Sequence, residues 1–523
     1  MKTYIRNFIV LLALGLSQVQ CSDDFLEVAN PNEIDATNFF QNLNQLELSL
    51  NSVYSAHADF ELYGADLLPF GLYGMAKIGD QEFINSQPRN EFYQNEVTTN
   101  NALVRNYWRS FYRGIGRAND FLTQSETFLE AEDVLPEERS RVAVMQGEAL
   151  FYRALNYFHL VRLWGVGRPV DDGGQALAVP LVLEIAPSRE DTNLSRAAVS
   201  DVYAQIIQDL QAAEVALPDE WSGENVARAD AFAAKALLGQ VYTYNENYTQ
   251  AAQKFEEVVE GPFSLVAFEE YQGLFNGENE FSSESLFELN YSVDMEETTW
   301  VGGTGHNTAL ILAPSGTGWS NNYPHDVNVR RFGEDPRLRI SMYEPGVDSV
   351  PAREGLILLP RYVPDEGALG WSFKKYVPNK TSIFQTNRNF GANINIIRLA
   401  DVYLMYAEVL NAQGSDAEAA EFMNKVRRRA YGGDPQTPNP AVDYVGIIGT
   451  QLRDSIREER FRELFAEGHR WYDLQRWRIA ETELAKYPTT RSGPVIFDPK
   501  DYYLPIPQGE VDQNTNMIQS TGY

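Results

Sequence analysis

The chain has 523 residues, of which 44% are hydrophobic and 12% aromatic, so it contains enough apolar material to bury a large core. Its formal net charge is -30 at pH 7, and this negative field disfavours nucleic acid and anionic lipid headgroups as partners. The single cysteine excludes an internal disulfide.

The N-terminus has the layout of a secretory signal. Two basic residues precede an apolar run over residues 8–16, which is too short to cross a bilayer because a spanning helix needs about 20 residues. The lone cysteine, Cys21, follows where cleavage would occur. We therefore expect residues 1–20 to be a signal peptide and residues 21–36 to be an extended linker.

Helical periodicity marks the N-terminal half of the chain. Apolar residues recur at steps of three and four in a first helix that Thr37 or Asn38 would cap. The same pattern predicts helices over residues 102–129, 136–164 and 199–217. Residues 62–101 lack this pattern and are rich in Gly, Pro, Asn and aromatic residues, which indicates a long functional loop.

Two later segments have the spacing of a tetratricopeptide repeat. In residues 238–258, Gly239 is small enough for two antiparallel helices to approach, and Phe255 fills the gap between them. The same register recurs over residues 406–426. Because such repeats bury their apolar faces only by stacking, we predict a mainly α fold: a tetratricopeptide-like bundle in which the earlier helices stack on the two repeats.

The remaining segments are less regular. Residues 264–395 carry few helical signals and one candidate strand at residues 287–293, and the chain after Pro488 is loop-like. Residues 452–478 are helical, with a predicted division at Gly468 and a predicted ion pair between Glu458 and Arg462 one turn apart.

No catalytic, nucleotide-binding or metal-binding motif is present. The sequence lacks the phosphate-binding, HExxH, CxxC and GxSxG patterns, and its 5 histidines do not stand at metal-ligand spacing. We therefore expect a binding protein without cofactor or metal rather than an enzyme.

One segment combines the residue types that hold sugars. Proteins bind a sugar by stacking an aromatic ring on its apolar face and surrounding its hydroxyl groups with polar side chains. The segment 298–326 contains these types among glycines. Its candidate ligand contacts are Trp300, Trp319, Tyr323, Asn321 and Asn322.

A small basic cluster follows this segment. Its members are Arg330, Arg331, Arg337 and Arg339. We favour structural ion pairs with Glu334 and Asp335, and the alternative is contact with the carboxylate or sulfate of an acidic glycan.

Three stretches of the C-terminal part resemble the SusD/RagB family of Bacteroidetes outer-membrane lipoproteins. These are RLADVYLMYAEVLN from residue 398, IREERFRELFAEGHRWYDLQRW from residue 456 and YYLPIPQGEVDQNTNMIQSTGY from residue 502. The resemblance implies four repeat pairs that support an irregular subdomain with a few short strands. It also implies that Cys21 is acylated and holds the protein at the cell surface of the outer membrane.

The resemblance also predicts domain boundaries. Residues 37–523 would form one SusD-like domain. Its helical scaffold would comprise about residues 37–263 and 396–480, and its variable subdomain about residues 264–395 and 481–523.

In the family, aromatic ligand contacts also come from the loop after the first helix. The matching region here is 70–93, and its candidates are Tyr73, Asp80, Gln81 and Tyr93. The implied function is capture of an oligosaccharide or polysaccharide and its delivery to a SusC-like TonB-dependent transporter. The alternative is a RagB-like protein with the same transporter and a peptide cargo.

Overall fold

The computed structural model describes residues 40–523 except 82–86, 169–170, 172–174, 189, 293–304, 353–354, 360–368, 380–389 and 491–492. The predicted signal peptide, linker and acylated Cys21 therefore lie outside the described residues, as does Trp300.

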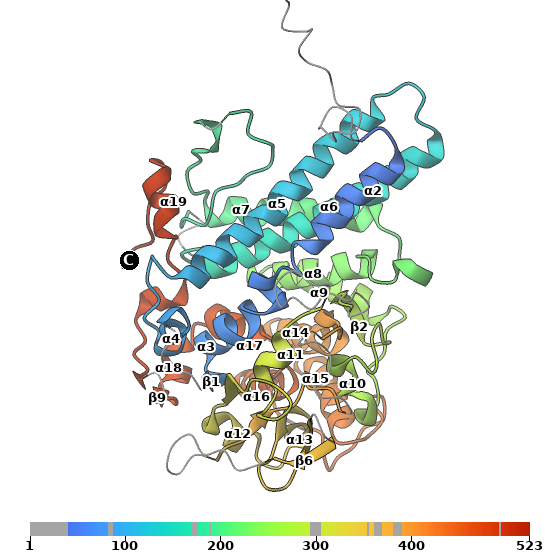
Figure 1. Cartoon of the computed structure of the whole chain (residues 1–523). Helices are drawn as coiled ribbons and strands as arrows, with labels where there is room; N and C mark the ends of the chain where they lie inside the picture. The colour runs from blue at the N-terminus through green and yellow to red at the C-terminus, as the bar shows by residue number, and fades with distance from the viewer. Residues whose placement is uncertain are drawn as a thin grey trace, which may run out of the picture.

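Helices dominate the described chain, as the sequence predicts (Figure 1). The scaffold helices are α2 (Leu43–Ser55), α5 (Ala102–Leu129), α6 (Pro136–Trp164), α7 (Val199–Ala216), α8 (Ala231–Tyr244), α9 (Tyr248–Val259), α14 (Leu399–Ala412), α15 (Asp416–Ala430), α16 (Gly449–Glu463) and α17 (His469–Arg476). Consecutive helices pack against each other from α5 to α9 and again from α14 to α16, and α14 also packs on α9. The two halves of the scaffold therefore join through the α9–α14 contact.

Capping residues set the ends of these helices. The side chain of Asn101 accepts hydrogen bonds from the backbone of Leu103 and Val104 at the start of α5. The first described helix, α2, begins at Leu43 and is capped by Asn42, whereas the predicted caps Thr37 and Asn38 lie outside the described residues.

Close packing at glycine confirms the predicted repeat geometry in the α8–α9 pair. A Cβ at Gly239 would lie 2.5 Å from the Phe255 ring, so the two helices approach as closely as they do only without a side chain there. Gly114 of α5 allows the same close approach to α6, because a Cβ there would lie 2.8 Å from the side chain of Asn156.

Short elements build the irregular part of the molecule. Its strands form antiparallel pairs: β1 (Gly79–Gln81) with β3 (Asn322–Pro324), β2 (Ser285–Leu289) with β8 (Ile394–Arg398), β4 (Met342–Tyr343) with β7 (Ser372–Phe373), β5 (Ser349–Ala352) with β6 (Gly355–Leu358), and β9 (Thr489–Thr490) with β10 (Gly493–Pro494). Its helices are η2 (Phe60–Gly64), η3 (Leu67–Leu72), α3 (Tyr73–Ala76), α4 (Gln87–Gln94), η5 (Glu190–Thr192), η6 (Gly223–Asn225), η7 (Phe268–Glu270), α10 (Gly273–Asn276), α11 (Thr308–Leu312), α12 (Asp326–Phe332), α13 (Arg337–Ser341), α18 (Ala480–Leu484), η9 (Pro499–Tyr502) and α19 (Gln508–Gln513). The expectation that residues 62–101 form a plain loop is wrong, because helical turns and a strand occupy much of it.

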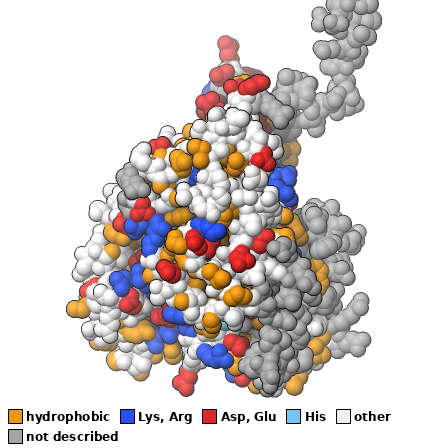
Figure 2. Space-filling view, turned by 90° about the vertical axis from the view of Figure 1, so that its left-hand side faces the viewer, with side chains coloured by type: hydrophobic (Ala, Val, Ile, Leu, Met, Phe, Trp, Pro, Cys, Tyr) orange, Lys and Arg blue, Asp and Glu red, His pale blue; other side chains and the backbone are white. Residues whose placement is uncertain are grey.

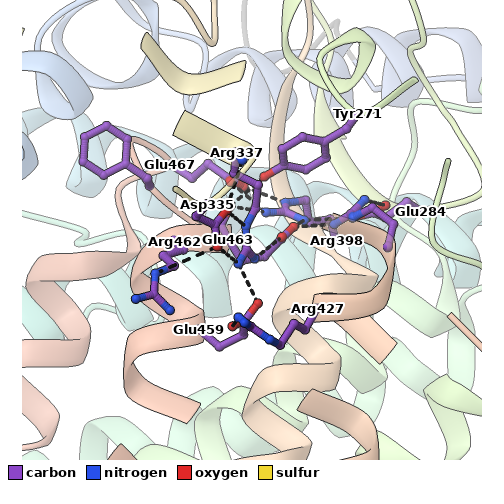
Figure 3. A network of polar contacts seen from close by, with 12 residues as sticks. Tyr271, Glu284, Asp335, Arg337, Arg398, Arg427, Glu459, Arg462, Glu463 and Glu467 are labelled. Carbon is purple, nitrogen blue, oxygen red and sulfur yellow. Dashed lines mark hydrogen bonds and ion pairs between the residues drawn. The ribbon is translucent and has the colours of Figure 1, made fainter. Parts of the chain in front are cut away.

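A buried ion network connects these short elements to the scaffold (Figure 3). Glu463 of α16 pairs with Arg398 at 2.7 Å and with Arg337 at 2.9 Å. Glu284 pairs with Arg398 and Arg429, each at 2.8 Å. Burial by itself raises the pKa of Glu463, but the surrounding guanidinium groups outweigh it and hold that pKa well below its ordinary value. Segments far apart in sequence therefore meet at one charged centre.

Several ion pairs of α16 and α17 reach other elements of the fold. Glu458 pairs with Arg331 of α12, and Arg462 lies 3.9 Å from Asp335, so the predicted pair between Glu458 and Arg462 is replaced by tertiary pairs. The predicted division at Gly468 is confirmed, since α16 ends at Glu463 and Gly468 precedes α17 with a φ of 87°.

One apolar core cluster runs through both the scaffold and the irregular part. The finer division into scaffold and variable subdomain stays a prediction. Among the described residues, no helix combines the length and the hydropathy that a membrane crossing requires.

Candidate functional site

The candidate site centres on the turn that follows α11. After this short helix the chain reverses, so that the backbone N–H of Trp319 donates to Leu310 at 2.7 Å and that of Asn321 donates to Ile311 at 2.9 Å. A Cβ at Gly318 would lie 2.6 Å from Ala313, so glycine is needed for this return. The turn is therefore fixed against α11 by its own backbone.

Strand pairing fixes the other end of the turn. Tyr323 lies opposite Asp80 in the β1–β3 pair, and Asn322 lies opposite Gln81. The structure thus brings together the two regions that the sequence analysis selects separately. The side chain of Gln81 lies outside the described part of the chain, as Trp300 does.

Trp319, Asn321 and Tyr323 are the half-buried candidates. Trp319 packs on the core from one side. The ring of a half-buried aromatic residue that is held by a fixed backbone loses little conformational freedom when it contacts a ligand. Among the candidates whose side chains are described, these three keep the most surface accessible to a ligand.

The other candidates whose side chains the structure describes are enclosed, in contrast to the surface positions expected from the sequence. Tyr73, Tyr93 and Asn322 have 0% of their surface exposed, and Asp80 has 5%. The Tyr73 hydroxyl donates to the carbonyl of Ala466, so this side chain links α3 to the turn before α17.

Tyr93 and Asn322 join two segments of the candidate site. The Tyr93 hydroxyl contacts Asn322 Oδ1, and Asn322 Nδ2 donates to the carbonyl of Pro69 at 2.9 Å. Burial raises the pKa of Tyr93 well above its ordinary value, so its hydroxyl stays protonated and serves as a donor inside the fold. These buried side chains hold the segments of the candidate site together and are not accessible to a ligand.

The basic cluster is mostly engaged within the protein. Arg337 pairs with Asp335 at 2.8 Å, as the sequence analysis favours, and Arg331 pairs with Glu483 at 2.9 Å. Arg330, at the surface, lies 3.7 Å from Asp326. These contacts support the structural interpretation of the cluster over contact with an acidic glycan.

The described part of the chain offers no candidate metal site. Its His, Cys, Asp and Glu side chains form no group of three or more that is arranged to hold a metal ion. Burial lowers the pKa of His57 to about 3, and His159 is stacked on Phe111 with ring centroids 5.2 Å apart. These imidazoles are neutral packing groups.

A cleft of about 520 Å³, which the sequence analysis did not anticipate, lies between α5 and α19. Trp108 of α5 lines the cleft and is buried. The residue that could have indicated the cleft is Tyr112, one turn further along α5, which is half-buried and also lines it.

Comparison with protein families matches both halves of the chain. A model described as "SusD family" matches residues 315–523. A second model, described as "Starch-binding associating with outer membrane", matches residues 24–243.

Individual relatives and solved structures agree with these matches. The chain is 27% identical to SusD-like protein P2 of Formosa agariphila, with 100% of both chains covered. It is 24% identical to the starch-binding protein SusD of Bacteroides thetaiotaomicron, over 78% of this chain and 76% of that one. A solved structure titled "Laminarin binding SusD-like protein" is 26% identical with a TM-score of 0.71, covering 92% of this chain and 100% of that one. A SusD-like protein of Bacteroides fragilis has the same fold, with a TM-score of 0.75 at 20% identity over 94% of this chain and 99% of that one. The two family matches, which together cover most of the chain, show that it belongs to the SusD/RagB family.

Proposed function

We propose that this protein is a non-catalytic lipoprotein of the outer-membrane surface that binds an oligosaccharide or polysaccharide. Acylated Cys21 would anchor it, and a SusC-like TonB-dependent transporter would receive the cargo. Family membership supports the class of protein, and the chain's similarity to a starch-binding and a laminarin-binding protein supports a glycan as cargo.

The observation that carries the proposal is the fixed turn with Trp319 and Tyr323. Backbone hydrogen bonds to α11 and pairing with β1 hold both residues in place, and each keeps part of its surface accessible. An aromatic ring of this kind offers a sugar an apolar face, and nearby polar groups such as that of Asn321 can meet its hydroxyl groups. Affinity of about micromolar strength suits capture followed by release.

Binding to a panel of soluble glucans, including starch and laminarin fragments, tests the proposal. We expect Trp319→Ala and Tyr323→Ala each to weaken binding roughly tenfold, because each removes one stacking surface. The matched control is Tyr431→Ala, which removes an exposed tyrosine at the end of α15 and leaves binding unchanged.

The products of the incubation separate the alternatives. A carrier retains glycans of unchanged length, whereas shortened glycans would indicate a hydrolase. Retention of peptides without retention of any glycan would favour the peptide alternative. Undiminished glycan binding by both site variants would show that the turn after α11 is not the binding site.

Partnership with a transporter needs a separate measurement. We expect affinity-tagged full-length protein to co-purify with a large TonB-dependent β-barrel protein from outer-membrane extracts of its own organism. Recovery of the tagged protein alone, under conditions that keep other membrane complexes intact, would contradict the partnership.

A further inference from the structure

The cleft between α5 and α19 has the size and the lining of a ligand site. Its volume of about 520 Å³ lies within the range of about 300–1,000 Å³ that is usual for small-molecule pockets. In Figure 1, α19 lies at the left edge of the molecule, and Figure 2 looks onto that side, where apolar, basic and acidic side chains are interspersed. The surface is therefore of the mixed kind that suits an amphiphilic ligand.

We propose that this cleft is a second saccharide-binding site, separate from the turn that carries Trp319. This inference rests on the proposed saccharide-binding function. It assigns the cleft to a short segment of a sugar chain, of the size that its volume can enclose.

The floor of the cleft is aromatic and well supported. Trp108 and Tyr112 lie in contact there, with ring centroids 4.9 Å apart. The Tyr112 hydroxyl donates to the carbonyl of Pro180 at 2.8 Å, which fixes the orientation of the ring. A half-buried ring with a fixed orientation provides an apolar surface on which the face of a pyranose can stack.

The wall opposite α5 is fixed by side-chain contacts to backbone carbonyls. Asn514 Nδ2 donates to Leu194 at 2.8 Å, and Asn516 Nδ2 donates to Asn193 at 2.7 Å. These bonds connect the loop before α7 to the chain after α19. The cleft is therefore preformed, and a ligand need not order its walls.

Polar groups at the rim match the hydroxyl groups of a sugar. Exposed Arg109 and Gln513 supply donors from opposite sides, and half-buried Glu510 supplies an acceptor. Burial raises the pKa of Glu510, and the charge of Arg109 partly offsets this effect. Donors and acceptors that converge above an aromatic floor are the arrangement expected for a carbohydrate.

Two substitutions at the rim test the inference on the full chain. Gln513→Trp fills the cleft from its exposed edge, and Arg109→Ala removes one donor. Their matched controls are Thr515→Trp, just beyond α19, and Arg105→Ala, one turn earlier on the exposed face of α5. Equal thermal midpoints of all four variants and the wild type confirm that the substitutions leave the fold intact.

Titration calorimetry uses laminarihexaose, maltohexaose and hexagalacturonate as probes, which distinguishes neutral from acidic sugars. For at least one probe we expect two sites per chain in the wild type and one in Gln513→Trp. Arg109→Ala should weaken the second site about tenfold, as expected for one charge-assisted hydrogen bond. The two controls should retain both sites.

The possible failures are distinguishable. No binding of any probe by the wild type overturns the proposed function and this inference with it. One site per chain that both Gln513→Trp and Arg109→Ala leave unchanged overturns the second site alone. The second site is also overturned if the control Thr515→Trp reduces binding as much as Gln513→Trp does.

Discussion

At the scale of single residues, Tyr93 shows how a polar aromatic side chain supports the candidate binding site without reaching the molecular surface. Its hydroxyl contacts Asn322 Oδ1 and the carbonyl of Pro69 in a buried position. Both partners belong to segments that frame the turn with Trp319. A buried donor of this kind holds two segments together because neither acceptor group has water as an alternative partner.

Tyr93→Phe removes only this hydroxyl. We expect a loss of about 1–3 kcal/mol in the free energy of unfolding, because the buried Asn322 Oδ1 loses a hydrogen-bond partner. Denaturant titration measures this loss, with Tyr431→Phe at the surface as the control. Saccharide affinity should be preserved, and a large drop in affinity without loss of stability would show that Tyr93 touches the ligand.

Local sequence could not separate Tyr93 from Tyr323. Both stand among Gly, Pro and Asn residues, and both are plausible sugar contacts by residue type. Their difference arises from the β1–β3 pairing. Asn322 of β3 is bonded to the buried hydroxyl of Tyr93, whereas its neighbour Tyr323 stays half-buried. The sequence therefore selected the region of the candidate site, whereas long-range pairing decided which of its side chains stay accessible.

At the scale of elements, long helices were predictable and short ones were not. The predicted helices at residues 102–129 and 136–164 match α5 and α6 in both bounds, because many turns repeat the apolar spacing. Elements such as η3 and α11 span too few residues to show a period. They form because tertiary contacts favour them, as the bond from the backbone of Asn307 to Gly64 illustrates at the start of α11.

Two glycines on helices should respond in opposite ways to the same substitution. At Gly239 a Cβ would meet the buried Phe255 ring, so Gly239→Ala should destabilise the protein by about 1–3 kcal/mol through overpacking. At Gly116 nothing lies within 4 Å, so Gly116→Ala should stabilise α5 by about 0.5–1 kcal/mol. Unfolding midpoints of the two variants measure the difference, and equal shifts would refute the close packing of α8 on α9.

At the scale of the whole molecule, buried charges connect the parts of the fold. Asp473 of α17 illustrates this arrangement, since it pairs with Arg460 of α16 at 3.0 Å and with Arg476 at 2.8 Å. Burial by itself raises the pKa of Asp473, but the two arginines outweigh it and lower the pKa to about 2. The folded protein therefore binds this proton less readily than the unfolded chain does.

This difference predicts sensitivity to acid. The pKa of Asp473 lies near 2 in the folded state against an ordinary value of 3.8, so its contribution is present above pH 3.8 and is lost as the pH falls towards 2. The contribution at pH 7 is roughly 2 kcal/mol. We expect Asp473→Asn to be less stable at pH 7 and to lose less stability than the wild type between pH 4 and pH 2. Parallel stability curves for the two proteins would contradict this assignment.

The position of Glu463 in the charged centre has a consequence for biosynthesis. Arg337, Arg398 and Arg429 precede it in the chain, and all three pair with its carboxylate. During translation these arginines emerge before their shared partner exists, so this charged centre cannot be completed until residue 463 has left the ribosome. The charged centre therefore forms only late in the synthesis of the chain, after the helices up to α15 have been made.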